Sequence, residues 1–297
     1  MSFSSEQIKK ISKEISSKVS GKTLFDEFSR GRYSTDASVY QIKPLGVILP
    51  KDTNDVLNIM DYSQRNSIPL LARGGGSSQC GQTVGESVVL DYSKHQNKIL
   101  ELNVKDKYVW VEPGVVLDHL NEYLKPYGLW FPVDVSTSSR ATIGGMSANN
   151  SCGSRSLYYG NMVHNVLAIE AILDDGSIFT FDQIEKNFLE RKNNQDRLYK
   201  IIDKFIDVRQ KVTNDIKDNW PTTQRRVGGY NIDLIDPNGF NSSNLLVGSE
   251  GTLSLFNKVK LKLSEIPKNK ILGVCYFDNF HQAMELSKEI VKLKPTC

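Results

Sequence analysis

Residues 68–81 read IPLLARGGGSSQCG, an apolar run that ends in an arginine, three glycines and two serines. Three successive glycines lose much backbone freedom on folding, so they indicate a backbone that must approach another group closely. Similar glycine-rich stretches occur at ATIGGMSANNSCG (141–153) and GSEGTL (248–253). Glycine lets backbone N–H groups converge on an anion, and nearby hydroxyls and amides add donors. Any one of these loops would also fit a tight turn, but together they favour a diphosphate ligand.

The two commonest nucleotide-binding motifs do not match these loops. In the Rossmann pattern G-x-G-x-x-G started at Gly74, the sixth position is Gln79. The P-loop pattern also fails, because no glycine in the required frame is followed by lysine and then Ser or Thr. Both of these common nucleotide-binding folds are therefore disfavoured.

Composition excludes several classes of partner. The chain has 297 residues, 39% of them hydrophobic and 24% charged, with a net charge of +3, which is typical of a soluble globular protein. No basic run is interleaved with aromatic residues, so no nucleic-acid partner is expected. The sequence has no export signal and no apolar stretch long enough to span a membrane, and a cytoplasmic location is expected.

The cysteines and histidines predict neither a disulfide framework nor a metal site. Their spacing contains no C-x-x-C, H-x-x-x-H or E-x-x-H pattern. The residues concerned are Cys80, Cys152, Cys275, Cys297, His95, His119, His164 and His281.

The order of elements predicts an α+β protein. The spacing of Ile8, Ile11, Ile15 and Val19 indicates an amphipathic helix at the N-terminus, and residues 45–72 read as strand, helix, strand. Further strands are expected at 87–93, 99–102, 107–112, 166–181 (a hairpin turning at Asp175-Gly176) and on both sides of the GSEG turn in 244–263, with helices at 115–128 and 196–212. Residues 131–162 are predicted to be a long functional loop.

The last residues predict an incomplete second domain. KILGVCYFDNFHQAMELSKEIVKLKPTC (270–297) reads as one strand and one helix, which cannot bury their apolar faces alone. We therefore divide the chain into an N-terminal helix and lead-in (1–40), a main domain (41–265) and the start of a further domain (266–297).

Four stretches, in this order, carry a resemblance to a known family. They are RGGGSSQCG, then DVSTSSRATIGGMSANNSCGSRSLYYGNMVHNVLAIEAILDDG, then GYNIDLI and LLVGSEGTL. Over about residues 33–265 the chain resembles the two-subdomain FAD-binding domain of the vanillyl-alcohol-oxidase and p-cresol-methylhydroxylase (PCMH) type. Within that superfamily it looks most like the dehydrogenases of D-lactate, glycolate and D-2-hydroxyglutarate. The resemblance implies that residues 266–297 begin a truncated α+β cap domain and that the chain is an N-terminal fragment or the product of a shortened gene.

The resemblance also implies which residues contact FAD. The first glycine loop would wrap the pyrophosphate, the second would run along the flavin, and the GSEGTL turn would flank adenine, ribose or the ring system. The implied contacts are Arg73, Gly74, Gly75, Gly76, Ser77, Ser78, Gln79, Pro132, Asp134, Ser136, Thr142, Gly144, Gly145, Asn149, Gly153, Val166, Ile169, Gly248, Glu250, Gly251 and Thr252.

Ser77 bears on how the flavin is held. Related oxidases attach FAD covalently through a histidine in the first glycine loop, and alignment places Ser77 at that position, so non-covalent FAD is expected. Cys80 and Cys152 could also bond a flavin carbon, although buried packing is the commoner role of cysteine.

The catalytic residues are less well defined. His164 is a candidate general base or a structural hydrogen-bonding residue. Arg225, Arg226 and Tyr230 could bind a substrate carboxylate, or could form a solvated loop or an interface with a missing domain.

The resemblance implies transfer of hydride from C2 of a small D-2-hydroxy acid to flavin N5, then electron transfer to a downstream acceptor or missing C-terminal domains. Two alternatives remain: an FAD-binding module without turnover, or an NADPH-dependent reductase of the same fold, against which GYNIDLI and the SxxRATIGGM loop argue.

Overall fold

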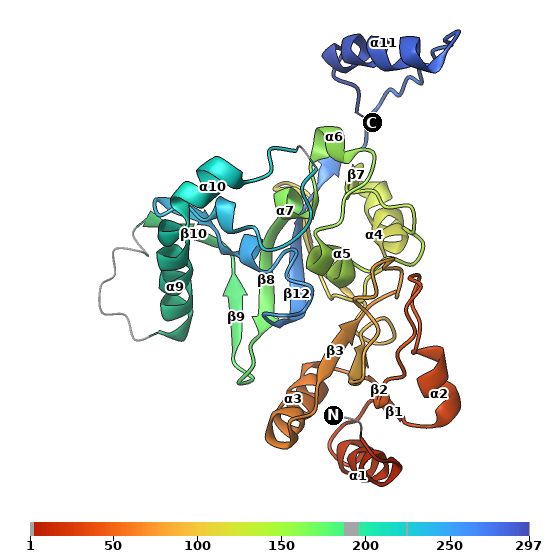
Figure 1. Ribbon diagram of the computed structural model, residues 1–297, viewed down its shortest axis with the longest axis vertical. Coiled ribbons are helices and arrows are strands. Elements are labelled where there is room, and N and C mark those ends of the chain that lie inside the picture. The colour runs from red at the N-terminus through yellow and green to blue at the C-terminus, as the bar shows by residue number, and fades with distance from the viewer. Residues whose placement is uncertain (1–2, 187–195, 224, 297) are drawn as a thin grey trace.

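The computed structural model describes residues 3–186, 196–223 and 225–296. Two sheets form the body of the molecule (Figure 1). The first has the order β1 (Lys22–Leu24), β2 (Gly46–Leu49), β4 (Val88–Asp91), β3 (Leu70–Arg73), with β2, β4 and β3 parallel and β1 antiparallel to β2. β2 and β3 are joined by α3 (Thr53–Asn66), which confirms the predicted strand, helix, strand unit.

Three helices accompany the first sheet. They are α1 (Ser5–Ser16), α2 (Glu27–Arg32) and α3, and they lie with it at the lower end of the view in Figure 1. A capping box between Ser4 and Gln7 starts α1, and the helix buries Ile11 and Ile15 in the same core as β2, β4 and α3. The predicted N-terminal helix is thus confirmed, and it completes the core of this first half.

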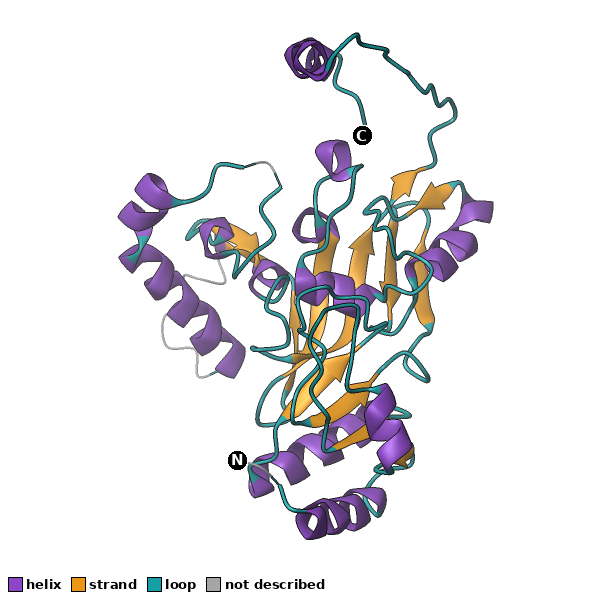
Figure 2. Ribbon diagram, turned by 45° about the vertical axis from the view of Figure 1, so that its right-hand side comes forward, coloured by secondary structure: helices purple, strands orange, loops and turns teal. Residues whose placement is uncertain are grey.

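The second sheet is antiparallel. Its strand order is β5 (Ile99–Asn103), β6 (Tyr108–Val111), β12 (Leu255–Lys262), β8 (Val166–Ile172), β9 (Ile178–Phe181). Figure 2 shows its strands side by side above the first sheet. Gly176 turns the β8–β9 hairpin with a φ of +82°, as the Asp-Gly pair predicted. Alternate residues of these strands, with α4 (Leu117–Leu124), α5 (Ile143–Asn149) and α9 (Arg197–Lys211), fill the larger core.

The remaining described elements are short, apart from α11. They are η1 (Lys125–Tyr127), β7 (Leu129–Trp130), α6 (Ser156–Tyr159), α7 (Met162–Asn165), β10 (Gln183–Glu185), α10 (Thr213–Asn219), η2 (Ile232–Leu234), β11 (Gly239–Asn241), η3 (Ser242–Leu245), β13 (Ser264–Glu265) and α11 (Phe280–Lys292).

The two halves are joined by apolar and polar contacts. Ile172 of β8 and Leu255 of β12 contribute to the core of the first half. Thr53 Oγ1 donates to Asn257 Oδ1 at 2.7 Å, and Asn257 Nδ2 donates to Glu170 Oε1 at 2.5 Å, so a polar bridge connects α3 to the second sheet. The architecture is therefore the predicted α+β fold of two subdomains.

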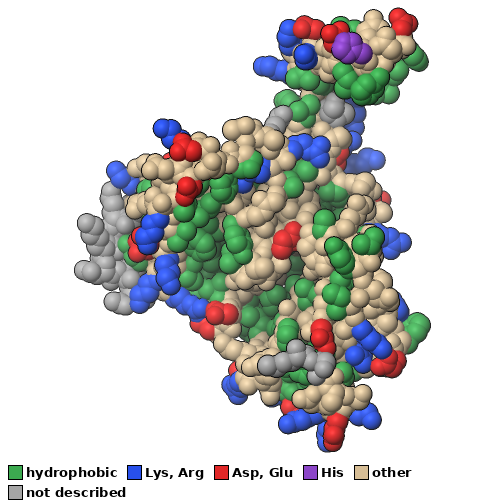
Figure 3. Space-filling model, viewed as in Figure 1, with side chains coloured by type: hydrophobic (Ala, Val, Ile, Leu, Met, Phe, Trp, Pro, Cys, Tyr) green, Lys and Arg blue, Asp and Glu red, His purple; other side chains and the backbone are tan. Residues whose placement is uncertain are grey.

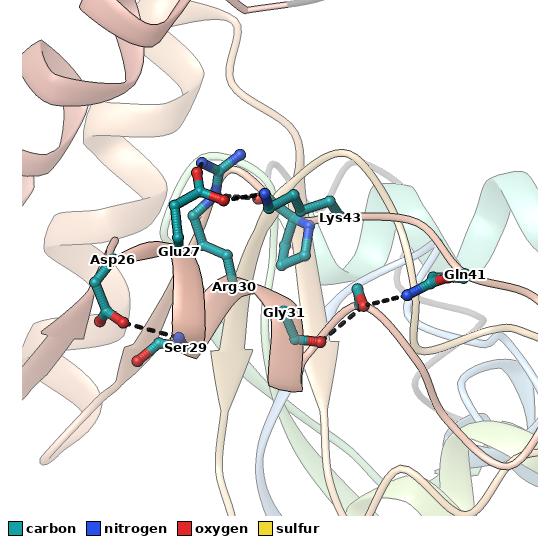
Figure 4. A network of polar contacts seen from close by, with 9 residues as sticks. Asp26, Glu27, Ser29, Arg30, Gly31, Gln41 and Lys43 are labelled. Carbon is teal, nitrogen blue, oxygen red and sulfur yellow. Dashed lines mark hydrogen bonds and ion pairs between the residues drawn. The ribbon is translucent and has the colours of Figure 1, made fainter.

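A polar network fixes the lead-in between α2 and β2. Figure 4 shows Glu27 against both Arg30 and Lys43. Gln41 Nε2 donates to Ser34 Oγ at 3.3 Å, and this hydroxyl donates to the carbonyl oxygen of Gly31 in α2 at 2.7 Å. Arg30 Nε also donates to the carbonyl oxygen of Pro44 at 2.8 Å. Residues 33–43 are thereby held in one path before the chain enters β2.

Three expectations about local structure were wrong. The long loop 131–162 contains α5, α6 and the start of α7, because Thr142 caps a helix that buries Ile143 and Met146. The apolar run before the GSEG turn forms η3 rather than a strand. Residues 270–276 form no strand, since this exposed segment pairs with no strand of the described chain, while α11 forms as predicted and stands apart from both sheets (Figure 1).

Candidate functional site

A cavity of about 490 Å³ lies between the two sheets. Its walls come from the first glycine loop after β3, from the second loop with α5, and from the turn containing Glu250 and Gly251. Figure 3 shows this face of the molecule hollowed, with hydrophobic side chains visible in the recess. The volume lies within the usual range for cofactor and small-molecule sites.

The two glycine loops pack directly against each other. A Cβ added at Gly74 would lie 2.0 Å from Thr142 Oγ1, and one added at Gly75 would lie 2.2 Å from the carbonyl oxygen of Arg140. Gly76 has a φ of +62°, which favours glycine in any case. The missing side chains therefore let one loop lie on the other and form a continuous wall.

The first glycine loop presents a row of unused backbone donors. None of the N–H groups from Gly74 to Gln79 donates a hydrogen bond to another described residue. Oxygen atoms of a diphosphate accept such groups well, and a nest of adjacent N–H groups is a common anion site. This part of the wall thus suits a phosphate-bearing ligand.

Two residues that line the cavity carry a buried hydroxyl group without a partner in the described structure. Tyr92 on the segment after β4 is 4% exposed, Ser254 before β12 is 8% exposed, and neither hydroxyl makes a hydrogen bond. Burial raises the pKa of the Tyr92 phenol. An unpaired buried hydroxyl costs about 1–3 kcal/mol, so a polar ligand that pairs with both would recover that energy.

Glu250 closes the cavity from the second half of the molecule. Its Oε1 accepts from Asn149 Nδ2 at 2.8 Å and from Gln82 Nε2 at 3.3 Å, so one carboxylate links all three walls. Burial raises its pKa, although the two amide donors act in the opposite direction. The backbone of Glu250 is left-handed, with a φ of +52°.

The side chain of Arg73 connects the start of the first glycine loop to neighbouring segments of the chain. Its guanidinium donates to the carbonyl oxygens of Thr35 at 2.8 Å, Thr83 at 3.0 Å and Tyr33 at 3.3 Å. Tyr33 OH in turn donates to Asp91 Oδ2 at 2.6 Å at the end of β4. The fixed lead-in thus positions the first glycine loop through Arg73.

The structure brings most of the predicted cofactor residues to this one cavity. Those that line it are Arg73, Gly74, Gly75, Gly76, Ser77, Ser78, Gln79, Ser136, Thr142, Gly144, Gly145, Asn149, Glu250 and Gly251. Those that do not line it are Pro132, Asp134, Gly153, Val166, Ile169, Gly248 and Thr252.

The predicted residues outside the lining have other contacts. Val166 and Ile169 are buried in the core of the second sheet. Asp134 accepts from Arg155 N at 3.0 Å and from Ser154 Oγ at 2.9 Å, and a Cβ at Gly153 would lie 1.9 Å from the Asp134 carbonyl oxygen. Asp134 and Gly153 thus shape the turn that follows Cys152, which does line the cavity.

None of the three catalytic candidates, His164, Arg225 and Tyr230, belongs to the lining of the cavity. His164 Nδ1 accepts from Asn161 N at 3.0 Å, which is a structural role. His164 is exposed, yet surrounding atoms shield part of its ring, and this desolvation with nearby Arg226 lowers its pKa. Arg225 Nη2 lies 3.2 Å from Cys152 Sγ at the rim.

The side chains of Arg226 and Tyr230 make contacts that fix the segment before η2. Tyr230 OH shares a hydrogen bond of 2.7 Å with Thr252 Oγ1 beside the GSEG turn. Arg226 Nη2 donates to Asp233 Oδ2 at 2.6 Å and stacks 5.0 Å from the Trp220 ring centre, so Arg226 is used within the fold. Val227, between them, reaches the lining.

Several lining residues were missed from sequence. Gln82, Thr83, Tyr92, Val227 and Ser254 belong to no glycine motif. The position of Gln82 and Thr83 just after the first loop is the one signal that would have indicated them.

Comparison with known proteins shows what this chain is similar to. Residues 44–182 match the family described as the FAD binding domain. The fold resembles that of alkyldihydroxyacetonephosphate synthase, with a TM-score of 0.63 at 17% identity over 92% of this chain and 47% of that one. Residues 44–182 thus match an FAD binding domain, and the fold is that of the synthase's corresponding part.

The relatives are 2-hydroxy-acid oxidoreductases. The chain is 36% identical over 272 residues to D-2-hydroxyglutarate dehydrogenase of Haemophilus influenzae, covering 87% of this chain and 26% of that protein. It is 32% identical to the enzyme of the same name from Escherichia coli, covering 92% and 28%. Identity to glycolate oxidase subunit GlcD of Bacillus subtilis is 29%, covering 93% and 49%. The chain is therefore a homologue of FAD-linked 2-hydroxy-acid dehydrogenases over part of their length.

The residues present fit FAD. The row of free N–H groups and the unpaired hydroxyls of Tyr92 and Ser254 supply donors along one cavity. Within the described ranges, no group of three His, Cys, Asp or Glu residues could hold a metal ion, and no helix is long and apolar enough to cross a membrane.

Proposed function

We propose that the chain is the FAD-binding part of a dehydrogenase that oxidises a small D-2-hydroxy acid at C2. The observation that carries the proposal is the single cavity in which both glycine loops and the Glu250 turn meet. The identity to D-2-hydroxyglutarate dehydrogenases over most of this chain supports the substrate class.

The chain's own residues would bind and orient the cofactor. The N–H groups of Gly74 to Gln79 would hold the pyrophosphate, and the hydroxyls of Tyr92 and Ser254 would donate to polar atoms deeper in the cavity. FAD, when bound, would accept two electrons from the substrate. Arg225 lies at the rim beside Cys152, where its guanidinium would attract a substrate carboxylate.

The mode of FAD attachment is part of the proposal. Ser77 lines the cavity where related oxidases carry a histidine, and serine forms no such bond to flavin. We propose non-covalent FAD, which acid precipitation tests directly. Yellow colour retained in the washed protein pellet would contradict this proposal.

Substrate-dependent reduction of the flavin tests the activity. FAD-loaded protein is mixed without oxygen with D-2-hydroxyglutarate, D-lactate or glycolate, and the flavin absorption band is followed. Bleaching by one D-acid, and not by its L-enantiomer, is the expected result. Arg225→Gln should slow bleaching while FAD still binds, whereas the exposed surface variant Lys105→Gln should leave both unchanged.

A second candidate is an FAD-binding module without turnover. The chain spans only 26% and 28% of the two D-2-hydroxyglutarate dehydrogenases compared above, which favours a role in which other segments supply the substrate site and the electron acceptor. Stoichiometric FAD binding without bleaching by any of the acids would select this function.

A further inference from the structure

A second cavity, of about 240 Å³, lies beside β7, which pairs with β13 in a separate two-stranded sheet. It shares no lining residue with the larger cavity. Its walls come from α4 and η1, from β7, from the turn before α6 and from the segment after β13. The lining residues are Asn121, Lys125, Trp130, Arg155, Ile266, Pro267 and Lys270.

The charges in this lining all have one sign. Lys125, Arg155 and Lys270 are cationic, and the lining contains no Asp or Glu. None of these three side chains forms an ion pair with a carboxylate of the described residues. Like charges brought together repel one another, and a concave site focuses their field, so the cavity attracts anions.

Hydrogen bonds fix the walls of this cavity without using the charged groups of Lys125, Arg155 and Lys270. Asn121 Oδ1 accepts from Phe131 N at 2.7 Å, so this amide is used by the backbone. Trp130 Nε1 donates to the Glu265 carbonyl oxygen at 3.2 Å, which fixes the indole. The backbone N–H of Arg155 is held by Asp134, while its guanidinium lies 4.9 Å from the Trp130 ring centre.

We propose that this cavity binds a small doubly charged oxyanion, either a phosphate or a dicarboxylate. Arg155, Lys125 and Lys270 belong to three different segments that line the cavity, so each supplies a separate positive charge to the anion. A guanidinium held over an indole keeps its outward N–H groups for bidentate binding. The face of Trp130, with Ile266 and Pro267, receives the apolar part of the ligand.

The volume agrees with a ligand of this size. Each liquid water occupies about 30 Å³, so the cavity has room for a small oxyanion together with several waters. The proposal does not rest on the proposed dehydrogenase function, because the two cavities have no residue in common.

Tryptophan fluorescence of the whole chain provides the test. Inorganic phosphate, and separately malonate, is titrated into FAD-free and FAD-saturated protein at constant ionic strength, with acetate as the singly charged control. A saturable fluorescence change with phosphate and malonate, weaker by at least tenfold with acetate, is expected in both forms of the protein. Trp130→Phe should abolish this change, because the other tryptophans, Trp110 and Trp220, line neither cavity.

Variants that each remove one positive charge test whether this cavity is the phosphate-binding site. Arg155→Gln and Lys125→Gln should each weaken phosphate binding by at least tenfold, while Lys105→Gln, an exposed lysine outside the cavity, should leave it unchanged. Melting temperatures with and without phosphate check that each variant folds and give a second readout of binding. Non-saturable changes, equal effects of Lys105→Gln and Arg155→Gln, or displacement of FAD by phosphate would overturn the proposal.

Discussion

Gly74→Ala tests whether contact between the glycine loops determines FAD binding. The backbone of Gly74 is not left-handed, so alanine is not excluded by its φ. The new Cβ would lie 2.0 Å from Thr142 Oγ1, and real Cβ contacts essentially never fall below 3.0 Å, so the two loops must separate by about 1 Å. Overpacking of this kind costs about 1–3 kcal/mol, which corresponds to a loss of FAD affinity of about 5- to 150-fold.

The assay is titration of apoprotein with FAD, followed by quenching of flavin fluorescence and by the melting temperature. Gly85→Ala is the matched control, because its Cβ would make only ordinary contacts of 3.5 Å with Leu71 and 3.6 Å with Ser87. The second variant, Thr142→Ala, loses the helix cap of α5 at a cost of about 1 kcal/mol but removes the clashing oxygen.

The double variant Gly74→Ala/Thr142→Ala tests whether the clash with Thr142 causes the loss of FAD affinity. Its loss of affinity should be smaller than the sum of the two single losses, since the clash exists only when both side chains are present. Equal behaviour of Gly74→Ala and Gly85→Ala, or a fully additive double variant, would refute the reasoning.

Further predictions concern buried polar groups. Tyr92→Phe should weaken FAD binding by about 2- to 10-fold in titration without lowering the melting temperature of the apoprotein, because its hydroxyl has no partner in the described structure; unchanged affinity would exclude a contact with FAD. Burial raises the pKa of Glu250, so the free energy of unfolding should fall as the pH rises from the ordinary carboxyl pKa through the raised one; Glu250→Gln should remove that fall in urea titrations between about pH 4 and 7. Asp55→Ala should destabilise the protein by about 3 kcal/mol in urea titrations, because the backbone N–H groups of Ser20, Gly21 and Lys51 lose their acceptor; a loss below about 1 kcal/mol would contradict this.

Local sequence patterns predicted the elements whose apolar faces repeat regularly. The strand, helix, strand unit over 45–72 and the helix α9 follow directly from such periodicity. α5 was missed because its sequence, IGGMSAN, contains two glycines and only seven residues. It forms because Thr142 caps it and because Ile143 and Met146 enter the core, which are consequences of tertiary packing.

Two apolar runs were predicted as strands but form no strand in the structure. Leu245, Leu246 and Val247 are buried, but they enter the core from η3 and the turn after it, and their backbone pairs with no strand of the described chain. Residues 270–276 are apolar and extended, yet a strand also needs a hydrogen-bonding partner. A hydrophobic run specifies burial or an interface, and its secondary structure depends on which backbone lies beside it.

The glycines show how much of the site the sequence contained. Their clustering predicted a close approach, and the resemblance assigned that approach to the pyrophosphate of FAD. The structure shows that the Cα sides of Gly74 and Gly75 face Thr142 and Arg140, while the N–H groups of the same loop are unused. Glycine is therefore required by the contact between the two loops even before a ligand binds. That contact joins segments almost seventy residues apart, which no local pattern can reveal, and it is what turns two separate loops into one wall of the cavity.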